Sequence, residues 1–330
     1  MPLGHWGTVM KRIVFAAALT VLAAAPAFGF GTVRGVGQNA EHERITRHAL
    51  ACPLIGATDD CFGEKTLVEL AGKDRNFGAV GLPDRGELVP SNKAHCDSGD
   101  YLDIPGYPRT AADGQAALLA CRGFMLEELD AAVSDAAKLV SNGALVKSQL
   151  AIPCLFVGQI KGRAKCNVIE DFGILLHTSQ DFYSHSNWVD QPDPALPIGV
   201  DNPPGLGNLT RAPFLDLRHR DVAVPPGLIT GCFENPPEKT HCNYGPDKLH
   251  RIKHAVVNKD EGTIDPIILT GTTQRGRIAD NFARAVNAAI GDSKDKWATL
   301  KERLIATYGA HDGALMACAI THDDPMEACR

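Results

Sequence analysis

Apolar residues recur at helical spacing in several separate segments of the chain. The clearest are 115–140, which is rich in Ala and Leu, and 167–188, and both segments predict long helices. A helix is also predicted at 40–50, where acidic residues come early and basic residues late. The remaining predicted helices are 248–257, 275–290 and 293–308.

Two long segments between these helices carry the composition of loops. Residues 52–108 hold many Gly, Pro and Asp, and residues 192–226 hold many prolines. No set of segments alternates strictly between apolar and polar residues, which disfavours a β-rich architecture. We therefore expect a mainly α fold, with residues 30–330 forming one multi-helix domain that carries long loops.

The N-terminal segment has the pattern of a secretory signal peptide. Lys11 and Arg12 precede an apolar run over 13–30, and small residues such as Ala27 and Gly29 offer a cleavage site. The alternative is a membrane anchor, but the run is shorter than the roughly 20 residues that span a bilayer and it contains Pro26. Residues 1–29 are thus predicted to be a signal peptide, and the mature protein to be secreted or periplasmic without a transmembrane segment.

The chain contains 10 cysteines, all of which follow the predicted signal peptide. An even number of cysteines in an oxidising compartment predicts disulfide bonds that staple the loops. A zinc–thiolate site is the alternative for any pair, but no CxxC spacing supports it. Proximity along the chain suggests the pairs Cys52–Cys61, Cys154–Cys166, Cys232–Cys242 and Cys318–Cys329, which leave Cys96 for Cys121.

Charge narrows the range of partners. The chain has 33 basic and 39 acidic residues, and two of the basic ones, Lys11 and Arg12, belong to the predicted signal peptide. This acidic balance argues against strong general binding of nucleic acid, which requires a basic face. A nuclease is not excluded, because bound metal ions supply local positive charge.

The segment 175–188 carries the most specific chemical pattern. His177, Asp181 and His185 follow one another at spacings of four residues, which on a helix places them on roughly the same face. Imidazole and carboxylate groups together suit zinc and related divalent ions. The alternative is a polar helix edge with ordinary hydrogen bonds. Three such residues in register favour the metal site.

Other candidate ligands are distributed along the chain in a way that fits a multi-helix metal site. Asp84 lies in a Leu-Pro-Asp-Arg segment, and Asp97 follows His95 closely. Any one of these residues alone is more often a surface or capping group, and Asp97 could cap a turn. The further histidines in this set are His42, His48, His241, His250 and His254.

The stretch from His177 to Trp188, His-Thr-Ser-Gln-Asp-Phe-Tyr-Ser-His-Ser-Asn-Trp, resembles the core motif of the HET-C (heterokaryon-incompatibility C) family. Shorter stretches at 41–46, 94–97 and 258–260 agree with it, so the resemblance covers about residues 40–290. HET-C proteins are in turn similar to the zinc-dependent phospholipase C and single-strand nuclease superfamily. The resemblance implies a phospholipase C/nuclease-like helical fold with a zinc cluster.

Carried over by motif, the resemblance implies a set of ligands for one to three zinc ions. The gap between Asp181 and His185 is shorter than in the hydrolases, and the N-terminal Trp that binds zinc there is missing, which leaves the number of ions open. His241 or His250 would complete the cluster, with His254 or Asp260 as partner. The other implied ligands are His42, Asp84, His95, His177, Asp181 and His185.

The expected activity is zinc-dependent hydrolysis of a phosphodiester in a phospholipid or a nucleic acid. Asp84 is the expected catalytic carboxylate, which would orient a nucleophilic water. An apolar rim would favour a phospholipid, and the low aromatic content of 6% disfavours base stacking. The alternative is a non-catalytic protein, stabilised by metal, with a recognition or toxin-like role. The sequence contains no GxSxG elbow, P-loop or dinucleotide fingerprint.

Overall fold

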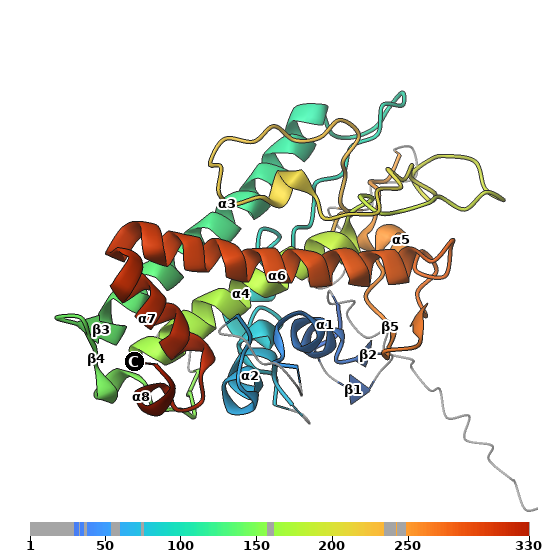
Figure 1. The fold of residues 1–330 in the computed structure, drawn as a ribbon. Coiled ribbons are helices and arrows are strands. Elements are labelled where there is room, and N and C mark those ends of the chain that lie inside the picture. The colour runs from blue at the N-terminus through green and yellow to red at the C-terminus, as the bar shows by residue number, and fades with distance from the viewer. Residues whose placement is uncertain are drawn as a thin grey trace, which may run out of the picture.

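Three long helices, α3, α4 and α6, organise the computed structural model of the protein (Figure 1). The structure describes residues 30–329 apart from 33, 36–37, 54–59, 74–75, 157–161, 234–241 and 243–248. Its α-helices are α1 (Glu41–Leu50), α2 (Glu64–Ala71), α3 (Ala111–Ala136), α4 (Ala164–His185), α5 (His254–Val257), α6 (Asn281–Tyr308), α7 (Ala310–Thr321) and α8 (Pro325–Ala328).

Strands and 3-10 turns are short in the described part of the chain. Each sheet has two antiparallel strands: β1 (Arg34–Gly35) with β2 (Gln38–Asn39), β3 (Val140–Ser141) with β4 (Ala144–Leu145), and β5 (Gly262–Ile264) with β6 (Leu269–Gly271). The 3-10 turns are η1 (Ala79–Gly81), η2 (Gly86–Leu88), η3 (Ala137–Leu139), η4 (Lys147–Gln149) and η5 (Pro213–Leu215). The expected mainly α fold is confirmed.

Helix α4 runs through the centre of the molecule, with α6 crossing in front of it and α3 beside it (Figure 1). Almost every residue of α4 is buried, including the polar residues of its C-terminal half. Phe172 of α4 packs against Phe62 and against Trp297 of α6, at ring-centroid distances of 6.3 and 5.8 Å. A helix buried on all sides has no solvated face, so its polar side chains must find partners inside the protein.

The predicted helices agree with the observed ones only in part. The helix predicted at 248–257 is only the single turn α5, and α2, α7 and α8 were not predicted. The predictions of separate helices at 275–290 and 293–308 are wrong, because α6 runs without interruption past Gly291. A glycine inside a helix costs only about 1 kcal/mol, and the buried face of α6 on both sides of Gly291 outweighs that cost.

All ten cysteines form disulfides, and the five predicted pairs are confirmed. Cys96–Cys121 ties a loop to α3, and Cys318–Cys329 ties α7 to the C-terminal segment that contains α8. Among the described residues no helix is long and apolar enough to cross a bilayer. The predicted signal peptide lies outside the described residues.

Candidate metal centre

Five predicted ligands come together where α1 meets α4, and we call them the α1 group: His42, Asp84, His95, His177 and Asp181. Asp181 lies at their centre. Its Oδ1 atom is 3.2 Å from Nε2 of His42, and its Oδ2 atom is 3.0 Å from Nε2 of His177 and 2.9 Å from Nδ1 of His95. Asp84 approaches from the loop before η2, with Oδ1 3.8 Å from Nε2 of His177. This arrangement gathers three imidazoles and two carboxylates in one place.

A second set of side chains forms at the C-terminal end of α4, and we call it the α5 group: Asp97, His185, His254 and Asp260. Oδ1 of Asp97 lies 3.2 Å from Nδ1 of His185 and 3.1 Å from Nδ1 of His254. Nε2 of the same two imidazoles lies 3.3 and 2.9 Å from the Oδ1 and Oδ2 atoms of Asp260. Two carboxylates therefore enclose two imidazoles.

Helix geometry explains why His185 belongs to a different group from His177 and Asp181. Eight residues of α-helix advance about 12 Å along the axis and turn about 80° away from exact register. The i, i+4 pair of His177 and Asp181 meets side by side. His185 is also four residues from Asp181, but it is the last residue of α4 and its ring turns to Asp97 and Asp260 in the loops beyond the helix end. The expectation of one face holding all three residues is correct only for the first two.

In three combinations the ligand atoms lie within 4.8 Å of one another, which is close enough to hold a metal ion: His42/His177/Asp181, Asp84/His95/His177 and Asp97/His185/His254. A fourth combination, Cys318/His322/Cys329, meets the same distance criterion. Its two sulfur atoms are joined in a disulfide, so it offers no thiolate to a metal.

Two imidazoles of the α1 group are held in the orientation that metal ligands need. Nδ1 of His42 faces Oε1 of Gln180 at 2.8 Å, and Nδ1 of His177 faces the carbonyl oxygen of Val80 at 2.9 Å. Both partners are oxygen acceptors, so each Nδ1 carries a proton and donates it. Nε2 of each ring, which points at Asp181, is thereby left unprotonated, as in a metal-binding histidine; that of His177 also lies 3.1 Å from Nδ1 of His95.

A tight loop at 95–98 supplies one residue to each group. Cys96 and Ser98 have positive φ angles of 53° and 64°, an uncommon conformation for residues other than glycine, and the Cys96–Cys121 disulfide fixes the loop. His95 consequently enters the α1 group and Asp97 the α5 group. The carbonyl oxygen of His95 accepts a hydrogen bond from Nδ1 of His185 at 2.7 Å, which connects the two groups.

Several buried polar atoms of these groups make no hydrogen bond of good geometry, although some face an ion-pair partner, as Nε2 of His42 and Oδ1 of Asp181 do at 3.2 Å. They are Nε2 of His42, His95 and His185, and Oδ1 of Asp84 and Asp181. Buried polar groups are normally satisfied, since each unpaired one costs about 1–3 kcal/mol. Such a concentration of unpaired lone pairs matches the donor set of a bound cation, so these residues fit a metal.

Burial and the neighbouring charges shift the pKa values of the ligands in both groups. Burial acts to raise the pKa of Asp181, but the imidazoles beside it, His177 first, hold that pKa well below its usual value. Burial lowers the pKa of His177 and so favours its neutral ring, whereas at His42 and His95 burial acts in the same direction but Asp181 outweighs it and raises the pKa. Burial also acts to lower the pKa of His254, but Asp97 and Asp260 outweigh it and raise the pKa to about 9. The carboxylates thus stay ionised and demand positive charge close by.

A buried ion-pair network fixes the position of Asp260. The neighbouring Lys259 is fully buried; its Nζ atom lies 3.0 Å from Oδ1 of Asp190 and donates hydrogen bonds to the carbonyl oxygens of Ser186 and Val257. Arg275 binds the other carboxylate oxygen of Asp190 at 2.9 Å. The segment that follows α5 is therefore anchored to the end of α4.

Two candidate histidines, His250 and the exposed His48, are not brought into either group. His250 is half-buried, with Nδ1 donating to the carbonyl oxygen of Arg251 and Nε2 3.4 Å from Asp201. His241 lies outside the described residues. Asp97 and Asp260 belong to the α5 group. The sequence offered both residues as candidates, but only their positions in the folded loops show that they join it.

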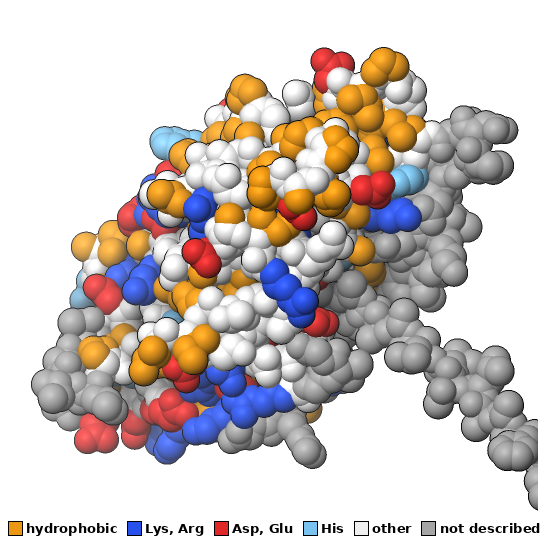
Figure 2. All heavy atoms as spheres, turned by 90° about the vertical axis from the view of Figure 1, so that its right-hand side faces the viewer, with side chains coloured by type: hydrophobic (Ala, Val, Ile, Leu, Met, Phe, Trp, Pro, Cys, Tyr) orange, Lys and Arg blue, Asp and Glu red, His pale blue; other side chains and the backbone are white. Residues whose placement is uncertain are grey.

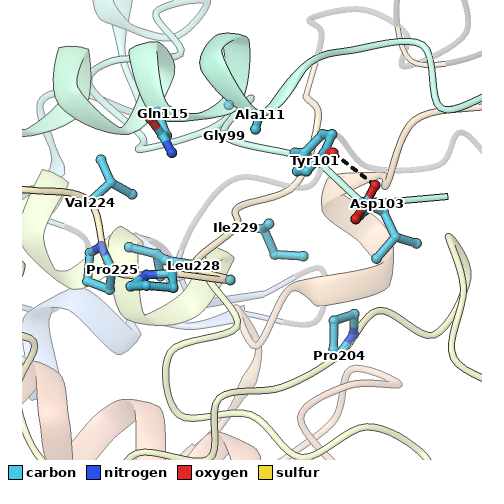
Figure 3. Close-up of a pocket in the computed structure, with 14 residues that line it drawn as sticks. Gly99, Tyr101, Asp103, Ala111, Gln115, Pro204, Val224, Pro225, Leu228 and Ile229 are labelled. Carbon is cyan, nitrogen blue, oxygen red and sulfur yellow. Dashed lines mark hydrogen bonds between the residues drawn. The ribbon is translucent and has the colours of Figure 1, made fainter.

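A pocket of about 300 Å³ lies between the segment that begins at Gly99, the start of α3 and residues 224–229 (Figure 3). Its lining is mostly apolar, with Val224, Leu228 and Ile229 on one side and the hydrogen-bonded Tyr101 and Asp103 at one end. Two of its lining segments continue to the α5 group: Gly99 lies two residues after Asp97, and the backbone N–H of Gly231, two residues after Ile229, donates to the carbonyl oxygen of His185.

Comparison of the chain with protein-family models, with curated proteins and with solved structures gives no match.

Proposed function

We propose that this chain is a secreted, HET-C-like metalloprotein that uses zinc to hydrolyse phosphodiesters. The observation that carries the proposal is the convergence of His42, His177 and Asp181. Their Nε2 and carboxylate atoms meet at 3.0–3.2 Å, and each Nδ1 atom is bonded to an oxygen on the far side of its ring. Ordinary buried histidines do not leave Nε2 and an opposing carboxylate oxygen unpaired.

The donor set favours zinc. Imidazole nitrogen and carboxylate oxygen are the ligands of catalytic zinc sites, and the absence of free thiolates argues against a purely structural cysteine site. The separation of ligands into an α1 group and an α5 group supports two ions or more. The fold would then be of the phospholipase C/nuclease type, as the sequence resemblance implies.

Bound zinc would supply positive charge that stabilises hydroxide at neutral pH and the charge that develops on a phosphodiester. The chain's own residues have separate tasks. Asp181 contacts all three imidazoles of the α1 group and holds them in register. Asp84, which is 94% buried at its side chain and has an unpaired Oδ1 atom, is placed to accept a hydrogen bond from a water molecule and to orient it.

The described surface favours an aliphatic phosphodiester over a nucleic acid. The pocket whose lining segments continue to the α5 group contains one aromatic ring, Tyr101, and no Lys or Arg. On the face drawn in Figure 2, basic side chains lie next to acidic ones along the lower edge, and hydrophobic side chains gather above them. A nucleic-acid groove would instead show a basic track with several stacking aromatics.

One observation favours a second candidate, a non-catalytic protein that binds metal for stability. His42, His177, Asp181 and His185 are all fully buried. Structural metal sites are closed, whereas catalytic sites keep a position open for water or substrate. In this alternative the same ligands would bind metal, and the protein would turn over no phosphoester.

The two candidates are separated by turnover. The mature protein, loaded with zinc, is assayed on bis(4-nitrophenyl) phosphate and on a short-chain phosphatidylcholine. We expect hydrolysis that stops with a chelator and in His177→Ala, and that persists in His250→Ala, the matched control for a histidine outside both groups. Zinc bound stoichiometrically without turnover on either substrate would support the non-catalytic protein, and no bound zinc would contradict both candidates.

A further inference from the structure

In the two ligand groups, Nδ1 of three imidazoles faces an oxygen atom that is not a carboxylate ligand, and only at His42 does that oxygen belong to a side chain. His177 and His185 donate to backbone carbonyl oxygens, whereas His42 donates to Oε1 of Gln180 at 2.8 Å. A backbone acceptor cannot be removed by substitution. The orientation of His42 therefore depends on one replaceable residue, and Gln180 directly precedes Asp181 on α4.

The amide of Gln180 is fully buried and its orientation is fixed by two hydroxyl groups. Its Nε2 atom donates to Oγ1 of Thr46 on α1 at 3.0 Å and to Oγ of Ser293 on α6 at 3.1 Å. With both N–H groups used in this way, only the carbonyl oxygen remains to face His42. Helices α1, α4 and α6 thus meet at a single amide.

The direction of the amide decides which nitrogen of His42 carries the proton. With the carbonyl oxygen facing Nδ1, the proton stays on Nδ1 and Nε2 presents a lone pair next to Asp181. A reversed amide would present N–H groups to Nδ1 and move the proton to Nε2. The ring would then donate to the carboxylate and offer no lone pair to a cation.

We propose that Gln180 is a positioning residue that holds His42 in its metal-binding tautomer, relaying the packing of α6 to the metal centre through Ser293. This inference rests on the metal-binding part of the proposed function and not on catalysis. Partners that orient metal ligands in this way typically contribute about 10- to 100-fold to metal affinity when they are removed.

The test measures zinc affinity by competition with a chromogenic chelator, and the ligand geometry by the visible absorption spectrum of the cobalt-substituted protein. Gln180→Leu should weaken zinc binding at the α1 group by about 10- to 100-fold and alter the cobalt spectrum. Gln180→Glu should restore affinity to within about threefold of the unsubstituted protein, because a carboxylate accepts from Nδ1 and the two hydroxyls can turn to donate to it.

The matched control is Thr178→Val, which removes a buried hydroxyl on the same helix that donates only to the carbonyl oxygen of Ile174. It should lower the thermal stability without changing zinc affinity or the cobalt spectrum. If the unsubstituted protein binds zinc and Gln180→Leu binds it within twofold of the same affinity, the inference is overturned. If the unsubstituted protein binds no zinc, the proposed function itself fails.

Discussion

Zinc should stabilise the folded protein, and each of the two ligand groups should contribute part of the stabilising free energy. A ligand that binds only the folded state at 1,000 times its dissociation constant stabilises that state by about 4 kcal/mol. One ion in the α1 group and one in the α5 group would together contribute about 8 kcal/mol at that free zinc concentration. For a chain of 330 residues, about 2 °C per kcal/mol converts this into a rise of about 16 °C in Tm.

The assay is thermal unfolding of the oxidised protein in zinc-buffered and chelator-containing solutions. The quantity compared is the zinc-induced change in Tm within each variant, so that any effect of the substitution on the metal-free fold cancels. Because all cysteines are in disulfides, the unfolded chain offers no thiolates that would compete for zinc.

Removing a ligand from one group should abolish only that group's part of the zinc-induced change in Tm. His177→Ala should retain about half of it, through the α5 group, and His254→Ala about half, through the α1 group. The double variant should show almost none, and His250→Ala should show all of it. A shift of equal size in all of these variants, or none in the unsubstituted protein, would refute the assignment of ligands to the two groups.

Two further predictions concern the buried cations. Burial lowers the pKa of Lys165 to about 8, so the folded state disfavours its charged form. Between pH 8 and 10.5 the unfolded chain binds more protons than the folded one, and the free energy of unfolding should therefore rise by about 3 kcal/mol. Paired denaturant titrations of the protein and of Lys165→Met, which lacks this rise, measure the difference. Lys259→Ala should lower the free energy of unfolding by about 3–5 kcal/mol in the same titrations, because it leaves the Asp190 carboxylate without one of its two cations. A decrease of less than about 1 kcal/mol would argue against the role of this ion pair in anchoring the segment after α5.

Local patterns in the sequence were sufficient for much of the fold. The helical spacing at 115–140 and 167–188 predicted α3 and α4 to within a few residues, since the period of apolar positions depends only on helix geometry. Cysteines separated by 9–12 residues paired as proximity suggested. The continuity of α6 through Gly291 could not be read from the sequence, because its tertiary packing outweighs a local signal to stop.

Some features of the candidate site likewise follow from local sequence spacing, and others depend on the tertiary structure. His177 and Asp181 meet because they are four residues apart on one helix, which is a local property. The entry of His95 and Asp97 into different groups depends on positive φ angles and a disulfide in a short loop, which no pattern in one sequence specifies.

The choice of His254 over His250 has a similarly distant cause. His254 begins the single turn α5, and its imidazole reaches Asp97 and Asp260, while the imidazole of His250 faces Asp201. Only the three-dimensional path of the chain around α5 separates two histidines, four residues apart, that the sequence offered as partners in one ligand pair.

The most direct test of a metal centre built from two ligand groups is anomalous diffraction at the zinc absorption edge, from crystals of the mature protein grown with zinc. One peak should lie about 2.0–2.2 Å from Nε2 of His42 and His177 and from Asp181, and another at the same distance from ligand atoms of Asp97, His185 and His254. Density that shows these imidazoles bonded directly to the aspartates, with no anomalous peak between them, would contradict it.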